Sequence, residues 1–246
     1  MIDVIRSEWI KMRSVRSTVW TLATTAVLML GFSALISASN KSVAEGPIPG
    51  DQAVTTSLSG GMIAALAMAA LGVLMISSEY RTEAIRVSLM AVPRRLTLLS
   101  AKIIVFTAVS LAVCLVASAG AIAVGVAIMQ PPSVEAADVA RSALGSALYL
   151  TACGLFGLGL GTLIRHTAGA IVSAIGLIMV LPPMMTQLPG AWGTTVADYF
   201  TTNAGLLIVS NQDNGSLGPW SGFAVYLAWV TAAMLAGAVL MRRRDA

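Results

Sequence analysis

The sequence predicts an all-α membrane protein with six transmembrane helices. Hydrophobic residues make up 57% of the 246 residues and charged residues only 11%, a balance that is unusual for a soluble domain of this length. The apolar residues gather in runs of about 20, the length of helix that crosses the hydrocarbon layer of a bilayer. The basic residues lie mainly between these runs, so the net charge of +4 indicates membrane orientation rather than nucleic-acid binding.

Six apolar runs are long enough to span the membrane. They cover residues 18–38, 57–77, 103–129, 142–164, 167–187 and 221–241. The third is long enough to tilt or to emerge from the bilayer. We expect residues 1–246 to form a single transmembrane domain around these spans.

Residues 2–16 predict a short helix before the first span. Its apolar positions recur at helical spacing and form a stripe: Ile2, Ile5, Trp9 and Met12. The basic residues lie off this stripe, which is typical of a helix that lies in the membrane interface.

Basic residues lie almost entirely on one side of the predicted membrane. That side holds thirteen of the fifteen Lys and Arg residues, and the other holds only Lys41 and Arg141. The positive-inside rule therefore places both termini in the cytoplasm, which requires an even number of spans. The outer segment 182–220 is too long for a bare connection, and its apolar middle, residues 192–209, predicts a helix that dips into the outer leaflet.

The central turns of the predicted spans contain no Asp, Glu, Lys, Arg or His. Transporters coupled to protons or ions usually need an ionisable residue at that depth, so the driving force is expected to come from outside the membrane. The sequence contains no GxxxxGK[ST] phosphate loop and no catalytic constellation. The two cysteines, Cys114 and Cys153, fall in apolar runs and are expected to be unpaired core residues.

Small residues mark two helix faces. Gly157 and Gly161 have the spacing that lets another helix approach closely. Gly169, Ser173 and Gly176 form a second stripe on the fifth span. This stripe could face a neighbouring helix or a second copy of the protein, and the residues leave both possibilities open.

The charged segment 78–95 follows the second span and is ended as a helix by Pro93. The order of charges in residues 79–86, with apolar side chains among them, favours a docking surface for another protein. For Arg94, Arg95 and Lys102 we favour solvated, positive-inside anchors.

Four motifs carry a resemblance to a known family. They are the opening Ser7-Glu8-Trp9-Ile10-Lys11-Met12-Arg13, the segment from Glu79-Tyr80-Arg81 to Val92-Pro93-Arg94-Arg95, the turn Gly159-Leu160-Gly161-Thr162-Leu163-Ile164-Arg165, and the outer motif Tyr199-Phe200-Thr201-Thr202-Asn203-Ala204-Gly205. In this order they resemble the permease subunits of ABC transporters of the type-2 exporter family, bacterial members with six spans. The outer motif departs from the family pattern, because Phe-Thr-Thr replaces the usual Leu-Pro-Ser before Asn203.

The resemblance implies an ATP-driven exporter of hydrophobic or amphipathic substrates in the bacterial plasma membrane. Residues 2–16 would be the interfacial connecting helix, and the outer segment 182–220 would cap the path, with its motif at Asn203, Ala204 and Gly205. A coupling helix would dock on a separate ABC ATPase through Glu79, Tyr80, Arg81, Thr82, Glu83, Ile85 and Arg86. Arg165 and His166 would form a smaller second contact.

The same resemblance implies partners. Two ATPase subunits would bind ATP and Mg, so this chain would need no cofactor of its own. A second permease copy or a paralogue would complete the path, chiefly through the second and fifth spans. Two alternatives stay open on the residues alone: an ATPase-independent transporter or channel, and a membrane assembly protein that transports nothing.

Overall fold

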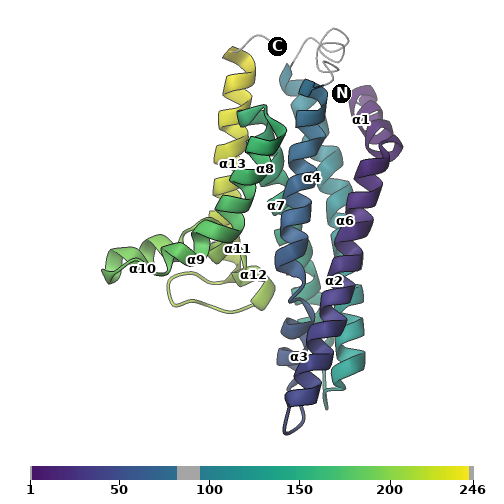
Figure 1. Ribbon diagram of the computed structural model, residues 1–246, viewed down its shortest axis with the longest axis vertical. Coiled ribbons are helices and arrows are strands. Elements are labelled where there is room, and N and C mark those ends of the chain that lie inside the picture. Colours follow the sequence, from purple (N-terminus) through teal and green to yellow (C-terminus); the bar gives the residue numbers. More distant parts are fainter. Residues whose placement is uncertain (1, 82–94, 244–246) are drawn as a thin grey trace.

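The computed structural model describes residues 2–81 and 95–243, and these residues form helices and connecting turns with no strand. Six helical segments are long and apolar enough to cross a membrane, which confirms the predicted fold class (Figure 1). They are Arg16–Val43, Gly50–Glu79, Thr97–Met129, Ala136–Ile164, Thr167–Met185 and Pro219–Met241. The chain is therefore a multi-pass, all-α membrane protein.

The described helices follow one another along the chain with short connections. They are α1 (Ile2–Ser14), α2 (Arg16–Val43), α3 (Gly50–Ser57), α4 (Gly61–Arg81), α6 (Arg95–Met129), α7 (Ala136–Ile164), α8 (Thr167–Ile175), η1 (Gly176–Val180), α9 (Leu181–Met185), α10 (Gly190–Asp198), α11 (Thr201–Gly205), α12 (Leu207–Ser210) and α13 (Pro219–Arg243). Figure 1 shows α1 and the last turns of α4 and α13 at one end of the bundle, which we call the terminal end. The short helices α3 and α9 to α12 lie away from that end (Figure 1).

Helix α7 is the most buried of the six spans and packs against α4, α6 and α13. Its glycines allow this: a Cβ at Gly157 would overlap the carbonyl oxygen of Ala69 on α4, and one at Gly161 would lie 2.7 Å from Ile76 Cγ2. On the facing helix, a Cβ at Gly72 would overlap the carbonyl oxygen of Gly154. Gly157 and Gly161 thus lie where α7 and α4 approach backbone to backbone.

The fifth span packs differently from α7. Ala170 and Ala174 are its buried residues in α8, whereas Gly169, Ser173 and Gly176 are only half-buried. A Cβ at Gly176 would meet no atom within 4 Å. At Gly176 this small-residue face therefore lacks a packing partner among the described helices.

The core lies between α4, α6, α7 and α13. Tyr149, Phe156 and Tyr226 are fully buried there, and the Tyr226 hydroxyl lies 3.1 Å from Cys153 Sγ. Cys114 and Cys153 are both buried and free, as predicted.

Two elements differ from the sequence expectation. The second span begins earlier, because the polar helix α3 precedes α4 and the chain turns between them at residues 58–60. The outer segment forms three short helices, α10, α11 and α12, rather than one helix over residues 192–209. Tyr199 and Phe200 leave helical geometry and so separate α10 from α11.

Candidate functional site

Four charged side chains form an ion-pair cluster at the terminal end, between α1, α4 and α6. Lys102 of α6 lies between two carboxylates, with its Nζ 2.6 Å from Glu8 Oε2 and 2.9 Å from Glu79 Oε1. Lys11 Nζ lies 2.7 Å from Glu8 Oε1 and 3.3 Å from Glu79 Oε1. The side chains of Glu8 and Lys102 are only 1% and 2% exposed. Among the described residues two lysines face two glutamates, so the charges that they bring to this Glu8–Lys102 cluster are equal and opposite, as burial favours.

The cluster shifts the pKa values of both groups that α1 contributes. Burial raises the pKa of Glu8, but the attraction and hydrogen bonding of Lys102 and Lys11 outweigh it and hold that pKa below its usual value. Burial lowers the pKa of Lys11, but its hydrogen bond to Glu8 and the attraction of Glu79 and Glu8 raise that pKa above its usual value.

These shifts define the pH range over which α1 is held. The stabilisation from Glu8 is present above the ordinary carboxyl pKa and is lost as pH falls through the lowered pKa. The stabilisation from Lys11 is present below the ordinary lysine pKa and is lost as pH rises through the raised pKa. Both residues are therefore charged near neutral pH, where the attachment of α1 is complete.

The cluster also decides which face of α1 packs against the bundle. Glu8 and Met12 are the buried residues of α1, and Ile5 packs partly against the core. Ile2 and Trp9 are 80% and 49% exposed. The predicted apolar stripe is thus divided between a packed face and an exposed face, because the pairing of Glu8 turns that side of the helix inward.

The interpretation of two charged residues changes with this geometry. Lys102 is not a solvated positive-inside anchor, because its ammonium is buried between two carboxylates. Glu79 is 12% exposed and is ion-paired with both lysines. Its carboxylate therefore ties the end of α4 to α1 and α6, and the docking role of Glu79 stays a prediction.

The turn between α7 and α8 lies beside the last turns of α4, since the Thr167 hydroxyl is 3.1 Å from that of Ser77. Arg165 ends α7 in the left-handed region, with φ 57°. His166 is exposed and caps α8, where its Nδ1 accepts a hydrogen bond from the Gly169 N–H at 3.1 Å. The structure thus brings the predicted second contact, Arg165 and His166, to the same end of the bundle as the end of α4.

Most of the predicted docking segment extends beyond this point. Tyr80 and Arg81 are the last two residues of α4. Four further docking residues lie outside the described residues: Thr82, Glu83, Ile85 and Arg86.

Away from the terminal end, three consecutive polar residues bind the backbone of the fifth span. The hydroxyls of Thr201 and Thr202 donate to the carbonyl oxygens of Leu177 at 2.7 Å and Ile178 at 2.8 Å. The Asn203 amide donates to the carbonyl oxygen of Pro182 at 3.2 Å and to that of Ala197 at 2.9 Å. We call these residues the 201–203 motif.

The other two residues of the predicted outer motif, Ala204 and Gly205, pack α11 against the core. Ala204 is fully buried. A Cβ at Gly205 would lie 2.9 Å from Tyr226 Cδ1 and 3.1 Å from Tyr149 Cε2, so only glycine fits between these rings without movement. Helix α11 is thereby held against α7 and α13.

Sequence reasoning missed Glu8, Thr201 and Thr202 as functional candidates. Glu8 falls on the same helical face as Ile5 and Met12, a spacing that could have indicated a buried carboxylate in need of a cation. No sequence signal names Lys102 as that cation, because 94 residues separate the two.

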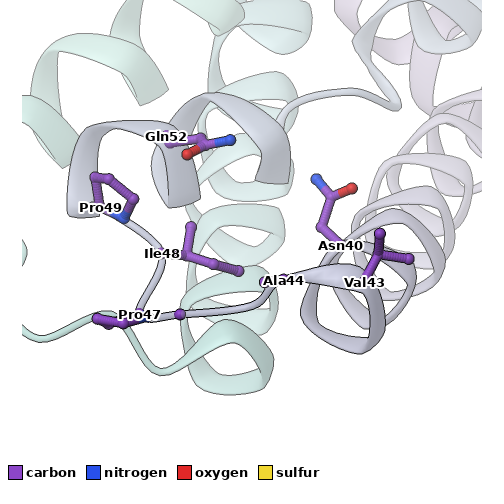
Figure 2. A pocket seen from close by; sticks show the side chains of 8 residues that line it. Asn40, Val43, Ala44, Pro47, Ile48, Pro49 and Gln52 are labelled. Carbon is purple, nitrogen blue, oxygen red and sulfur yellow. The ribbon is translucent and has the colours of Figure 1, made fainter.

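One open pocket lies far from these sites, between the end of α2 and the start of α3 (Figure 2). Its volume is about 310 Å³, and Asn40, Val43, Pro47 and Gln52 are among the residues that line it. Its lining includes no charged side chain. Among the described residues, no group of three or more His, Cys, Asp or Glu is placed to hold a metal ion.

The fold and the position of the Glu8–Lys102 cluster define a helical membrane protein with a buried ion-pair cluster at one end. In a comparison with protein families, residues 4–182 match the family described as ABC-2 family transporter protein. The chain belongs to this family and is a membrane permease of the ABC transporter type, which implies association with an ABC ATPase. A search of curated proteins finds no match to the chain.

Proposed function

We propose that this chain is the membrane-spanning subunit of an ATP-driven exporter of hydrophobic or amphipathic substrates. The observation that carries the proposal is the Glu8–Lys102 cluster, which ties the connecting helix α1 to α4 and α6 at the base of the predicted docking segment. A force applied there is transmitted to two spans at once. Within the described spans, the Asp, Glu, Lys, Arg and His side chains lie within about two turns of a helix end, which argues against ion coupling at depth.

The terminal end faces the cytoplasm in this proposal. The distribution of Lys and Arg supports this orientation through the positive-inside rule. The exposed face of α1, which carries Trp9, Ile10 and Arg13, suits the inner interface of a bacterial plasma membrane. The helices α9 to α12 then lie toward the outer face.

The mechanism follows from rigid helices that are moved at one end. Two ATPase subunits close on ATP and Mg and push the predicted coupling segments, residues 79–86 of each permease, toward each other. The α7–α8 turn, with Arg165 and His166, provides the smaller second contact. Because each helix is held by its internal hydrogen bonds, the motion reaches the outer end as a two-state rearrangement.

A second permease copy, or a related permease, completes the path. The half-buried face of α8 with Gly169, Ser173 and Gly176 is the surface that we assign to this contact, since no described helix fills it at Gly176. The cargo is apolar or amphipathic because the spans offer no charge at depth to bind an ion. Exposed methionines such as Met179 and Met184 would give the path a pliable lining.

The test is purification of the tagged chain from its native membranes in mild detergent. We expect one type of nucleotide-binding subunit to co-purify in equal amount and the complex to hydrolyse ATP. In the Arg86→Glu variant, reversed charge in the docking segment should lower the ATPase retained by about tenfold, since a charge contact contributes on the order of 1–2 kcal/mol.

The matched control is Arg141→Glu. Arg141 is 58% exposed, pairs with Asp138 on α7 and lies on the opposite face in the proposed topology, so its reversal should leave ATPase binding unchanged. A wild-type chain that purifies without any ATPase would contradict the proposed function.

A further inference from the structure

The fifth span is interrupted near its outer end. After α8 the chain makes one π-helical turn, η1 (Gly176–Val180), and then continues as α9, whose second and third residues are Pro182 and Pro183. Proline has no N–H and cannot donate to the helix that precedes it. A helix in lipid must nevertheless satisfy its carbonyl groups, because no water is present there to do so.

Two particular carbonyl groups of the span, those of Leu177 and Ile178, therefore lack a donor within the helix. The N–H of Leu181 donates to Gly176, five residues earlier, and so is not the partner of Leu177. The π partner of Leu177 would be Pro182, which has no N–H. For Ile178, the α and π partners would be Pro182 and Pro183, and neither can donate.

These two carbonyl groups are the ones that the 201–203 motif binds. The buried hydroxyls of Thr201 and Thr202 donate to Leu177 and Ile178 at 2.7 and 2.8 Å. Consecutive side chains of α11 thus replace the helix donors that the prolines remove.

These hydrogen bonds differ from those inside a helix in one respect. They come from a separate segment, so moving α11 away from the span breaks them without unwinding α8. On the other side of the break, Met179, Val180 and Met184 are 41%, 48% and 56% exposed, so no described element covers them. The outer end of the fifth span is therefore held from the α11 side and is open on the side that the proposed function assigns to the path.

We propose that Thr201 and Thr202 are positioning residues of the transport path, whose hydroxyls hold the outer end of the fifth span closed. Release of the two hydrogen bonds lets α9 swing from α11 at the proline break and opens the outer end. The Asn203 amide of α11 also donates to Pro182 on α9 and to Ala197 on α10, and its bond to Pro182 breaks as well when α9 moves away from α11. The role of this contact in transport rests on the proposed function. The closing contact itself does not depend on that function.

The experiment measures thiol labelling at Ile178→Cys, a position whose side chain is only 1% exposed in the closed arrangement, in the complex with its ATPase in nanodiscs that expose both faces. The native cysteines are buried, so background labelling is low. Thr201→Val/Thr202→Val keeps side-chain shape and removes both donors. We expect it to label about 25-fold faster, because each of the two hydrogen bonds lost shifts the open fraction by roughly fivefold. Thr201→Val alone should label about fivefold faster, and it provides the test if the double variant does not fold.

Two controls separate positioning from general loosening. Thr201→Ser/Thr202→Ser keeps the hydroxyls and should restore the parent labelling rate. Thr231→Val removes a hydroxyl that bonds only within α13, to Leu227, and should change nothing. The closing contact is contradicted if the valine variants label within twofold of the parent rate. It is also contradicted if the serine double variant does not restore the parent rate.

A nucleotide arm tests the role in transport. Trapping the parent with ATP and vanadate should accelerate labelling. In the valine double variant the outer end is already open, so its labelling rates with and without ATP and vanadate should be nearly equal. A parent that hydrolyses ATP with no labelling response overturns the role in transport. A complex that hydrolyses no ATP contradicts the proposed function instead, while the nucleotide-free labelling still decides whether the contact exists.

Discussion

Lys102 is the residue on which the terminal end depends most. It is 2% exposed and bridges Glu8 on α1 to Glu79 on α4, so three helices meet at one ammonium group. A buried ion pair contributes little net stability compared with apolar packing, but removing one partner leaves an uncompensated charge. The cluster therefore acts mainly by fixing the position of α1.

We expect Lys102→Met to destabilise the protein by about 3–5 kcal/mol, because Glu8 and Glu79 then share only the half-exposed Lys11 and one buried negative charge is left unbalanced. Unfolding in mixed SDS micelles measures the change. The double variant Glu8→Gln/Lys102→Met removes one of the two negative charges and should recover part of the loss.

Lys41→Met is the matched control. Lys41 is exposed and donates to the Ile128 carbonyl oxygen, so its loss should cost about 1 kcal/mol or less. Strictly additive effects of the Glu8 and Lys102 substitutions would show that the two residues do not interact.

At the residue scale, features that depend on local surroundings were predictable from the sequence, whereas the partners of contacts between distant residues were not. A lysine near the end of a span counts as a positive-inside anchor until its carboxylate partners are known, and those of Lys102 come from two other helices. The buried cysteines were predictable because only their local apolar surroundings matter. The roles of Thr201 and Thr202 depend on two prolines roughly 20 residues earlier, a relation that only the folded backbone reveals.

At the scale of elements, the contact between α4 and α7 controls the packing of the bundle. The two helices meet through glycines, so their backbones touch along this contact. The glycine spacing in the sequence indicates such a contact, although it does not identify α4 as the neighbour.

Gly157→Ala should destabilise the bundle by roughly 1–3 kcal/mol, since the added methyl group would overlap the Ala69 carbonyl oxygen and push α4 away. Gly31→Ala provides the opposite case within α2, because a Cβ there meets no atom within 4 Å. It should be neutral or stabilise by about 1 kcal/mol through helix propensity. The same micelle unfolding assay compares them, and equal effects at the two positions would argue against the close contact.

The six spans were predictable because run length and apolarity alone determine whether a helix crosses a bilayer. The interruptions within them were not. The polar sequence of helix α3 is typical of a loop. The π-helical turn η1 lies inside an apolar run, and its own residues show no change in composition. Such irregular turns depend on which other segment supplies the missing hydrogen bonds.

At the scale of the whole molecule, the two ends of the bundle have different kinds of contact. The terminal end is fixed by buried charges, whereas the outer end of the fifth span is held by hydrogen bonds from a separate short helix. This arrangement suits a protein that is pushed at one end and opens at the other. In the proposed function the energy comes from the partner ATPase, since the described spans contain no Asp, Glu, Lys, Arg or His at depth.

The most direct measurement uses proteoliposomes that contain the chain with its ATPase partner, or the chain alone, and a fluorescent hydrophobic cargo. We predict movement of the cargo against its gradient only when the partner, ATP and Mg are all present. Accumulation of cargo by the chain alone, without nucleotide, would contradict the account.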